Sequence, residues 1–198
     1  MKKVLFIVAS VCILFAGIIS HAEEQQQTVL FNYENGLQGW EIPDWAYEKP
    51  DHVQKEISQS SDYASEGTSS LKIDANFPGG RWTGAIIEIM QYYDWSDYKK
   101  LACDIYIPKD APLGLKAKMI LTVGDSWKWV EMSKSYSLVP GEWVTVEADI
   151  APGSIDWRRV QVDETFRKDI RKIDIRIDSN NKPAYEGPIY IDNVRVIK

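Results

Sequence analysis

The sequence predicts an all-β protein, an antiparallel β-sandwich of the jelly-roll type. Apolar and polar residues alternate with a period of two in one segment after another, as expected for strands with one buried face and one wet face. Turn signals rich in glycine, proline and asparagine separate these segments. No stretch longer than about one turn carries a convincing helical apolar stripe. About ten strands with such regular punctuation are typical of a sandwich.

Each expected strand is defined by apolar residues that share one face. In chain order these are Leu71, Ile73 and Ala75; Leu101, Cys103, Ile105 and Ile107; Ala117, Met119, Leu121 and Val123; Val144, Val146, Ala148 and Ile150; and Ile173, Ile175 and Ile177. The last segment carries Ile189 and Ile191, then Val194 and Val196, and this change of phase at Asp192–Asn193 suggests a β-bulge. We expect the first segment, "TVLFNY", to pair with the last.

The beginning of the sequence has the pattern of an export signal. Two lysines precede an apolar run, Val4–Ile19, and "SHA" then has the small-x-small form of a cleavage site. The run is shorter than a membrane span needs, so an uncleaved anchor is the alternative with less support. We expect a signal peptide at 1–22, a short polar leader at 23–27 and one domain at 28–198, secreted from a bacterial cell.

Charge and cysteine content exclude several classes of protein. The formal net charge of −6 is a poor match for nucleic acid or anionic lipid. Cys12 would leave with the signal, and Cys103 lies in an alternating strand, where a small buried residue is expected rather than a nucleophile. We therefore expect no nucleic-acid partner, no membrane attachment after signal cleavage, and a monomer.

Signals for catalysis are weak. His52 is the only histidine after the predicted cleavage site, and no nucleophile elbow or His/Cys metal spacing accompanies it. Glu147 and Asp149 have the spacing of a carboxylate pair, but their strand looks like a solvated face. The acidic and basic residues of 174–178 alternate in sign, which favours a self-neutralising charge ladder. We predict a protein that is not an enzyme, with a polysaccharide hydrolase or lyase on the same scaffold as the alternative.

The eight tryptophans are the most informative residues. Trp40 and Trp95 lie in segments that look structural. Trp45, Trp82 and Trp127 lie in or beside turns, among small or charged neighbours. Exposed indoles on a rigid scaffold are costly unless they bind something. Sugars suit them, because the C–H face of a pyranose stacks on an aromatic plane and its hydroxyls remain for polar side chains.

The stretch "VGDSWKWVEM" separates two of these rings. The turn signal "GDS" places Trp127 at the mouth of the sheet. Trp129 lies further into the strand, where it is either a second platform or ordinary sheet packing. The polar residues expected to choose among sugars are Arg81, Glu88, Gln91, Asp125 and Lys128.

A metal site is suggested where the two ends of the domain meet. Glu34 follows the first expected strand, Asp192 lies in the last one, and a polar loop, 64–72, enters a strand between them. Oxygen ligands without nitrogen or sulfur describe calcium. The alternative is a turn with solvated acids.

Four stretches together resemble one known family. They are "FNYENGLQGW", "WTGAIIEIMQYYDWSDYKKLACDIYIP", "VGDSW" and "YEGPIYIDNVRV". The chain from Thr28 to Lys198 is similar to family 27 carbohydrate-binding modules, which are mannan-binding jelly rolls of bacterial mannanases. The closing motif alone is shared by calcium-containing, galactose-binding-like β-sandwiches.

The resemblance implies a cleft in which Trp45, Trp82 and Trp127 stack on consecutive sugars of a β-1,4-mannan. It also implies a structural calcium held by Glu34 and Asp192, with oxygens from the loop that contains Ser65, Gly67 and Ser70. Two departures matter. Trp40 could replace Trp45 as a platform, because the segment around them aligns loosely, and Trp129 has no counterpart in the family pattern.

The sequence therefore predicts a non-catalytic module that binds extended mannan, galactomannan or glucomannan of plant cell walls. A module for β-glucan or cellulose is the nearest alternative. A protein-interaction or surface-layer domain is a further one, and it would display its tryptophans as a flat patch instead of a cleft.

Overall fold

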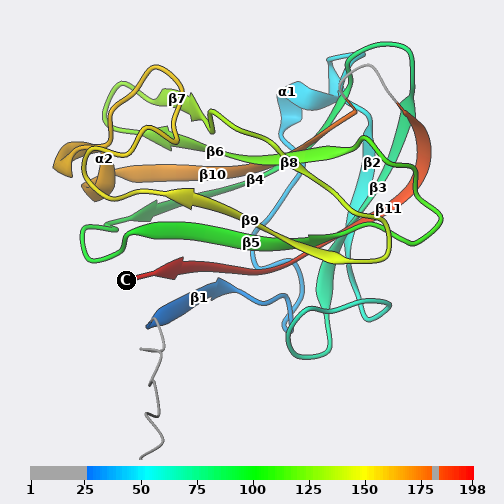
Figure 1. Cartoon of the computed structure of the whole chain (residues 1–198), viewed down its shortest axis with the longest axis horizontal. Coiled ribbons are helices and arrows are strands. Elements are labelled where there is room, and N and C mark those ends of the chain that lie inside the picture. Colours follow the sequence, from blue (N-terminus) through cyan, green and yellow to red (C-terminus); the bar gives the residue numbers. More distant parts are fainter. Residues whose placement is uncertain (1–25, 180–182) are drawn as a thin grey trace, which may run out of the picture.

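Two antiparallel sheets face each other in the structure, a computed structural model that describes residues 26–179 and 183–198 (Figure 1). This confirms the predicted all-β sandwich. The predicted signal peptide, 1–22, and most of the polar leader lie outside the described residues. Among the described residues, no helix has the length and apolar character needed to cross a membrane.

The six-stranded sheet, here called sheet A, contains both ends of the described chain. Its strands are β2 (Gln54–Ser60), β3 (Ser70–Pro78), β11 (Ala184–Ile197), β5 (Lys100–Tyr106) and β9 (Trp143–Asp149) in spatial order, with β1 (Gln27–Phe31) paired to β11. The pairing of β1 with the end of β11 is antiparallel, as expected for the first and last segments.

The five-stranded sheet, here called sheet B, carries the candidate site. Its strands are β4 (Gly84–Tyr93), β10 (Ile170–Asp178), β6 (Lys116–Val123) and β7 (Lys128–Glu131) in spatial order, with β8 (Tyr136–Ser137) paired to β6. Two short helices, α1 (Asp44–Tyr47) and α2 (Glu164–Lys168), complete the fold. Asp163 begins α2, because its side chain accepts a hydrogen bond from the Phe166 amide at 2.8 Å.

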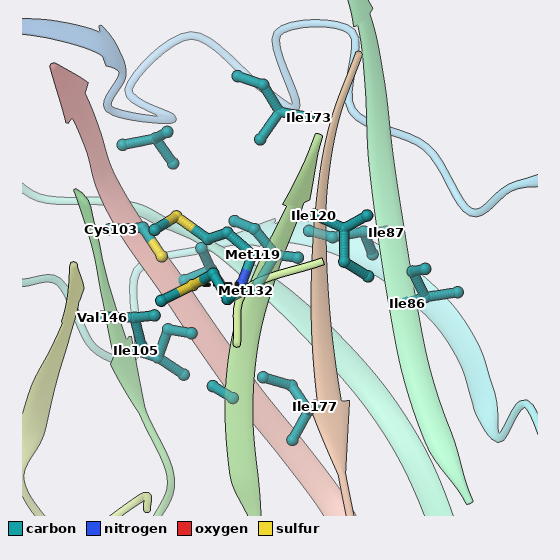
Figure 2. Close-up of a cluster of buried hydrophobic side chains, with 14 of the residues drawn as sticks. Ile86, Ile87, Cys103, Ile105, Met119, Ile120, Met132, Val146, Ile173 and Ile177 are labelled. Carbon is teal, nitrogen blue, oxygen red and sulfur yellow. Dashed lines mark hydrogen bonds between the residues drawn. The ribbon is translucent and has the colours of Figure 1, made fainter. Parts of the chain in front are cut away.

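The core lies between the two sheets and is built from the alternating residues that the sequence indicated. Cys103 of β5 meets Met119 of β6 and Met132 near the centre of this layer (Figure 2). Cys103 is a free, buried thiol, as expected. Burial of each large apolar side chain contributes about 1.5–3 kcal/mol relative to exposure, which is the main force that holds the two sheets together.

Two bulges set the direction of the side chains that matter for the site. On β11 the register with β5 shifts between Asp192 and Arg195, and Asn193 adopts a φ of 50°. This is the bulge predicted from the sequence. On β10 a second shift, between Ile170 and Lys172, occurs in the pairing with both β4 and β6. After it, the isoleucines of β10 face the core and the charged residues face outward.

Candidate functional site

Four aromatic side chains gather over the outer face of sheet B, and we call them the aromatic cluster. They are Trp45 of α1, His52 before β2, Trp82 before β4 and Trp129 of β7. The ring centroids of Trp45 lie 4.9 Å from His52 and 6.3 Å from Trp129, and those of His52 and Trp82 are 6.1 Å apart. All three contacts are edge-to-face, so neighbouring ring planes lie close to perpendicular.

Trp45, and not Trp40, is the available ring in the first loop. Trp40 is 3% exposed and packs edge-on against Phe31, with ring centroids 5.5 Å apart. Trp45 is 37% exposed, because Pro43 turns the chain into the single-turn helix α1, which projects it outward. The alternative in which Trp40 replaces Trp45 is therefore wrong. Trp95 is buried as well, as its segment suggested.

Trp82 is placed by a turn that only glycine can form. Gly79 has a φ of 74°, and a Cβ there would lie 2.9 Å from the backbone nitrogen of Ala184. Arg81 fixes the turn by donating a hydrogen bond to the carbonyl of Pro50 at 3.1 Å, and it remains exposed. This bond joins the turn to the segment that carries His52. Arg81 thus acts as a support for the cluster in this structure.

Beneath the aromatic cluster lies a set of ionisable side chains that we call the charged floor. Its members come from all four main strands of sheet B and are Glu88, Lys118, Glu131, Lys172, Asp174, Arg176 and Asp178. Glu88 accepts a hydrogen bond from Lys172 Nζ at 2.7 Å. The same Nζ lies 5.0 Å from the Trp129 ring centroid, so the floor contacts the aromatic cluster directly.

Arg176 is the central cation of the floor. Its guanidinium donates to both carboxylate oxygens of Glu131 at 3.1 and 3.3 Å and to Asp178 at 2.9 Å, and it lies 5.6 Å from the Trp82 ring centroid. Burial alone would raise the pKa of Glu131, but the hydrogen bonds and charge of Arg176 outweigh it and lower the pKa. The predicted charge ladder is present as ion pairs on one face of β10, and its two carboxylates, Asp174 and Asp178, are buried.

Asp174 is the most unusual group of the floor. Its side chain is fully buried, and neither carboxylate oxygen has a hydrogen-bond partner among the described residues. Lys172 Nζ lies 3.3 Å from one of these oxygens, which gives an ion pair without hydrogen-bond geometry. Burial raises the pKa of Asp174 to about 8; the charge of Lys172 opposes this shift, and the neighbouring Glu88 carboxylate adds to it.

Trp127 stands apart from the aromatic cluster. It lies in the turn between β6 and β7 with a φ of 53°, at 47% exposure, and its ring packs 5.2 Å from the Arg171 guanidinium. Arg171 also lies 5.5 Å from the Tyr92 ring and pairs with Asp125 and Asp169. A role for Trp127 as a sugar platform stays a prediction, at the end of the sheet beyond Trp129.

Trp129 is not core packing, because it is 40% exposed within the aromatic cluster. It lies opposite Thr122 on sheet B. Of the other predicted residues, Glu88 belongs to the floor. Lys128 precedes Trp129 on β7 and points to the opposite face of that strand, while Gln91 is exposed near the end of β4.

The sequence did not predict four residues of the aromatic cluster and the charged floor: His52, Glu131, Lys172 and Arg176. The alternation in "RKIDIRID" does place the charges of β10 on one face. What the alternation cannot show is that α1 and the turn before β4 bring indoles over that face. The isolated β-bridge between His52 and Gly84 is a similar long-range contact without a local sequence signal.

The predicted metal residues meet around the loop before β3. Oδ2 of the buried Asp192 accepts hydrogen bonds from the amides of Ser65 at 2.8 Å and Glu66 at 3.1 Å. Oε1 of Glu34 accepts from the amides of Thr68 and Ser69 at 2.7 and 2.8 Å. The hydrogen bonds with Thr68 lower the pKa of Glu34, whereas burial raises that of Asp192.

These contacts join Glu34 and Asp192 to the loop, as predicted. In them the two carboxylates accept hydrogen bonds from backbone N–H groups of the loop, so the loop does not direct carbonyl oxygens at the same carboxylates. Gly67 is needed there, because a Cβ would lie 2.4 Å from Glu34 Oε1, while the Ser70 hydroxyl turns away to the carbonyl of Tyr63 at 2.6 Å. The described residues contain no group of three or more His, Cys, Asp or Glu suited to a metal.

One observation still favours a cation at this place. A pocket of about 220 Å³ beside the loop is lined by oxygen-bearing side chains, including Asn32, Glu34, Glu66 and Asn193. Asn193 donates its amide N–H to Asp104 at 3.0 Å, which leaves its Oδ1 buried and without a partner among the described residues. Oxygen ligands of this kind fit calcium. In this structure Asn193 is a better candidate ligand than Ser70.

The two facing sheets, with indoles above the polar face of one of them, have the fold of carbohydrate-binding modules of the β-sandwich type. The fold is shared with a family 27 module of Caldicellulosiruptor saccharolyticus solved with mannohexaose, at TM-score 0.59 and 20% identity over 86% of this chain and 96% of that one. It is shared equally with a family 28 module specific for non-crystalline cellulose, at TM-score 0.61 and 16% identity over 87% and 96%.

Residues 31–193 match the family described as the mannanase, galactose-binding domain-like family, and the chain belongs to it. A second family 27 module, from a study of specific mannan recognition, has TM-score 0.54 and 17% identity over 87% of this chain and 95% of that one. The chain is thus a galactose-binding-like domain of this mannanase family, and it shares its fold with modules of family 27. A search of curated proteins gave no match.

Proposed function

We propose that this protein is a non-catalytic module that binds extended β-1,4-mannan chains through the aromatic cluster. The observation that carries the proposal is the placement of Trp45, Trp82 and Trp129 above the charged floor. Indole planes accept the C–H faces of sugars, and the floor supplies donors and acceptors for their hydroxyls. By analogy with aromatic pairs, each platform adds about 0.5–1.5 kcal/mol beyond area burial.

Two comparisons support mannan, galactomannan or glucomannan as the ligand. The chain belongs to a mannanase-associated family, and its fold is similar to that of a module solved with mannohexaose. A β-glucan is the second candidate. It is favoured by the likeness to the cellulose-specific module and to a family 11 module of Clostridium thermocellum solved with a β-1,3-1,4-linked tetrasaccharide. Mannose and glucose differ in one axial hydroxyl, so a few hydrogen bonds decide between them.

Native affinity electrophoresis in galactomannan, glucomannan and β-glucan tests the proposal. We expect retardation by the two mannans, weakened on the order of tenfold by Trp45→Ala, Trp82→Ala or Trp129→Ala. Tyr63→Ala is the control, because this exposed ring packs on Tyr106 of the other sheet and should not alter retardation. Unretarded migration of the wild type in every polymer would overturn the proposal.

The same polymers decide between a binding module and an enzyme. A non-catalytic module leaves the number of reducing ends unchanged after prolonged incubation, whereas a hydrolase or lyase increases it.

We also propose that the protein acts as a monomer outside the cell, after removal of residues 1–22.

A further inference from the structure

The polar face of sheet B does not end at its edge strand. Trp157 forms an antiparallel bridge with Met132, and the Arg158 amide donates to the Glu131 carbonyl at 2.8 Å. The segment 156–158 therefore continues the sheet beyond β7, and Arg159 follows it with a left-handed φ of 58°. This extension brings two arginines beside Trp129, at the rim of the proposed binding face.

A pocket of about 200 Å³ lies at this rim, lined by Trp129, Glu131, Arg158 and Arg159. Arg159 also lines a neighbouring pocket of about 330 Å³ together with Lys128. The site thus combines an exposed indole plane with exposed guanidinium groups. An indole suits the C–H face of a sugar, and guanidinium suits a carboxylate, to which it donates two parallel hydrogen bonds.

The charges at the rim do not cancel. Glu131 already accepts two hydrogen bonds from Arg176, and it forms an ion pair with Lys118, whose Nζ lies 3.5 Å from Oε2. Arg158 lies 3.6 Å from Glu131, beyond hydrogen-bond distance, and its side chain is 55% exposed. Arg159 forms no ion pair with any described residue.

The rim is therefore cationic in a protein whose formal net charge is −6. The pocket beside Trp129 is lined by two cations, Arg158 and Arg159, and by one carboxylate, Glu131, whose oxygens already accept hydrogen bonds from Arg176. Surplus positive charge next to an aromatic platform is the arrangement that an anionic sugar unit requires.

We propose that this rim is a subsite for a sugar unit that carries a carboxylate, a uronic acid, stacked on Trp129 and bound by Arg158 and Arg159. The inference rests on the proposed function, because it extends the same face. The pocket of about 200 Å³ beside Trp129 gives room for a charged unit at the end of the bound chain or on a side branch. The protein would then prefer acidic β-mannan-type chains over neutral ones.

A matched pair of ligands tests this preference by calorimetry. Mannohexaose and the β-1,4-linked hexamer of mannuronic acid share linkage and ring stereochemistry, and they differ in the carboxylates. We expect the acidic hexamer to bind on the order of tenfold more tightly at low salt, as charge-assisted hydrogen bonds predict. The excess should shrink as salt is added.

The double variant Arg158→Gln/Arg159→Gln should lose this excess and keep its affinity for mannohexaose. Lys109→Gln, an exposed cation elsewhere, is the matched control and should behave as wild type. Equal melting temperatures of the variants establish that folding is intact.

Three results would overturn the inference. The first is a wild type that binds mannohexaose without preferring the acid, and in that case the proposed function survives. The second is an equal loss of affinity for both hexamers in the double variant, which would mean that the arginines bind the neutral sugar as well. The third is equal binding of a sulfated mannan, which indicates unselective charge attraction. If the wild type binds the acidic hexamer but does not bind mannohexaose, the inference stands. In that case the proposed function, binding of neutral mannan, is overturned.

Discussion

Trp40 and Trp45 show how closely spaced identical residues take different roles. Trp40 fills the core beside Phe31, whereas Trp45 stands on α1 and contacts other rings at the surface. Trp40→Ala should therefore lower the free energy of unfolding by about 3–5 kcal/mol, because it opens a cavity. Trp45→Ala should lower it by less than about 1 kcal/mol while weakening sugar binding.

Chemical denaturation monitored by circular dichroism measures both variants. The Trp95→Ala variant serves as a second core example, since Trp95 is also buried. An equal loss of stability in the Trp40 and Trp45 variants would contradict the division into core and surface rings.

Asp174 should make stability depend on pH. Its pKa is raised by burial from the usual value of about 4 to about 8, so the folded state favours the protonated carboxyl. The contribution to stability is complete below pH 4 and is lost as the pH rises through 8. Asp174→Asn is neutral at every pH, so we expect a smaller difference between its unfolding midpoints at pH 5 and pH 9.

Asp110→Asn is the control for that comparison, because Asp110 is exposed and remote from the floor. A pH dependence that is the same in the wild type and in the Asp174 variant would assign the effect to other groups.

Strands were predictable here because their signal is local. In β10, each isoleucine that the alternation assigned to the core is buried there, and the bulge of β11 falls where the phase changes. Helix α1 has no comparable signal, since a single turn is too short for a period of 3.6 to appear. The ring that it projects, Trp45, was identified from its polar, proline-flanked neighbours instead.

The floor of the site was only half predictable, for a related reason. The sequence identified Glu88 as a polar site residue and the charges of β10 as a ladder. Their burial depends on Trp45 and Trp82, which arrive from loops far away in the chain. The turn signal before Trp127 separated it from Trp129, but the sequence favoured Trp127 as the platform, whereas Trp129 is the ring that contacts Trp45. That contact is made across the sheet and has no local sequence signal.

The two ends of the domain are held together by one loop, which Glu34 contacts from the β1 side and Asp192 from β11. We propose that calcium strengthens this junction through Glu34 and the unpartnered oxygen of Asn193. A ligand at one hundred times its dissociation constant adds about 2.7 kcal/mol of stability. We therefore expect calcium to raise the melting temperature and a chelator to lower it.

Glu34→Gln should abolish this response, whereas Glu142→Gln, which replaces an exposed acid outside the loop, should preserve it. A wild-type melting temperature that is the same with calcium and with chelator would rule out a structural ion. The hydrogen bonds from the loop amides would then be sufficient to hold the junction.

The pairing of β1 with β11 also determines where a fusion partner or a surface linkage at either end of the domain would lie relative to the aromatic cluster. The Lys198 amide donates to the Gln26 carbonyl at 3.0 Å, so both ends of the described chain leave from neighbouring points on sheet A (Figure 1). The aromatic cluster lies on the outer face of sheet B, with the thickness of the sandwich between. A bead, a fluorophore or an enzyme fused to either end would therefore be carried behind the molecule, with the tryptophans directed toward the polymer.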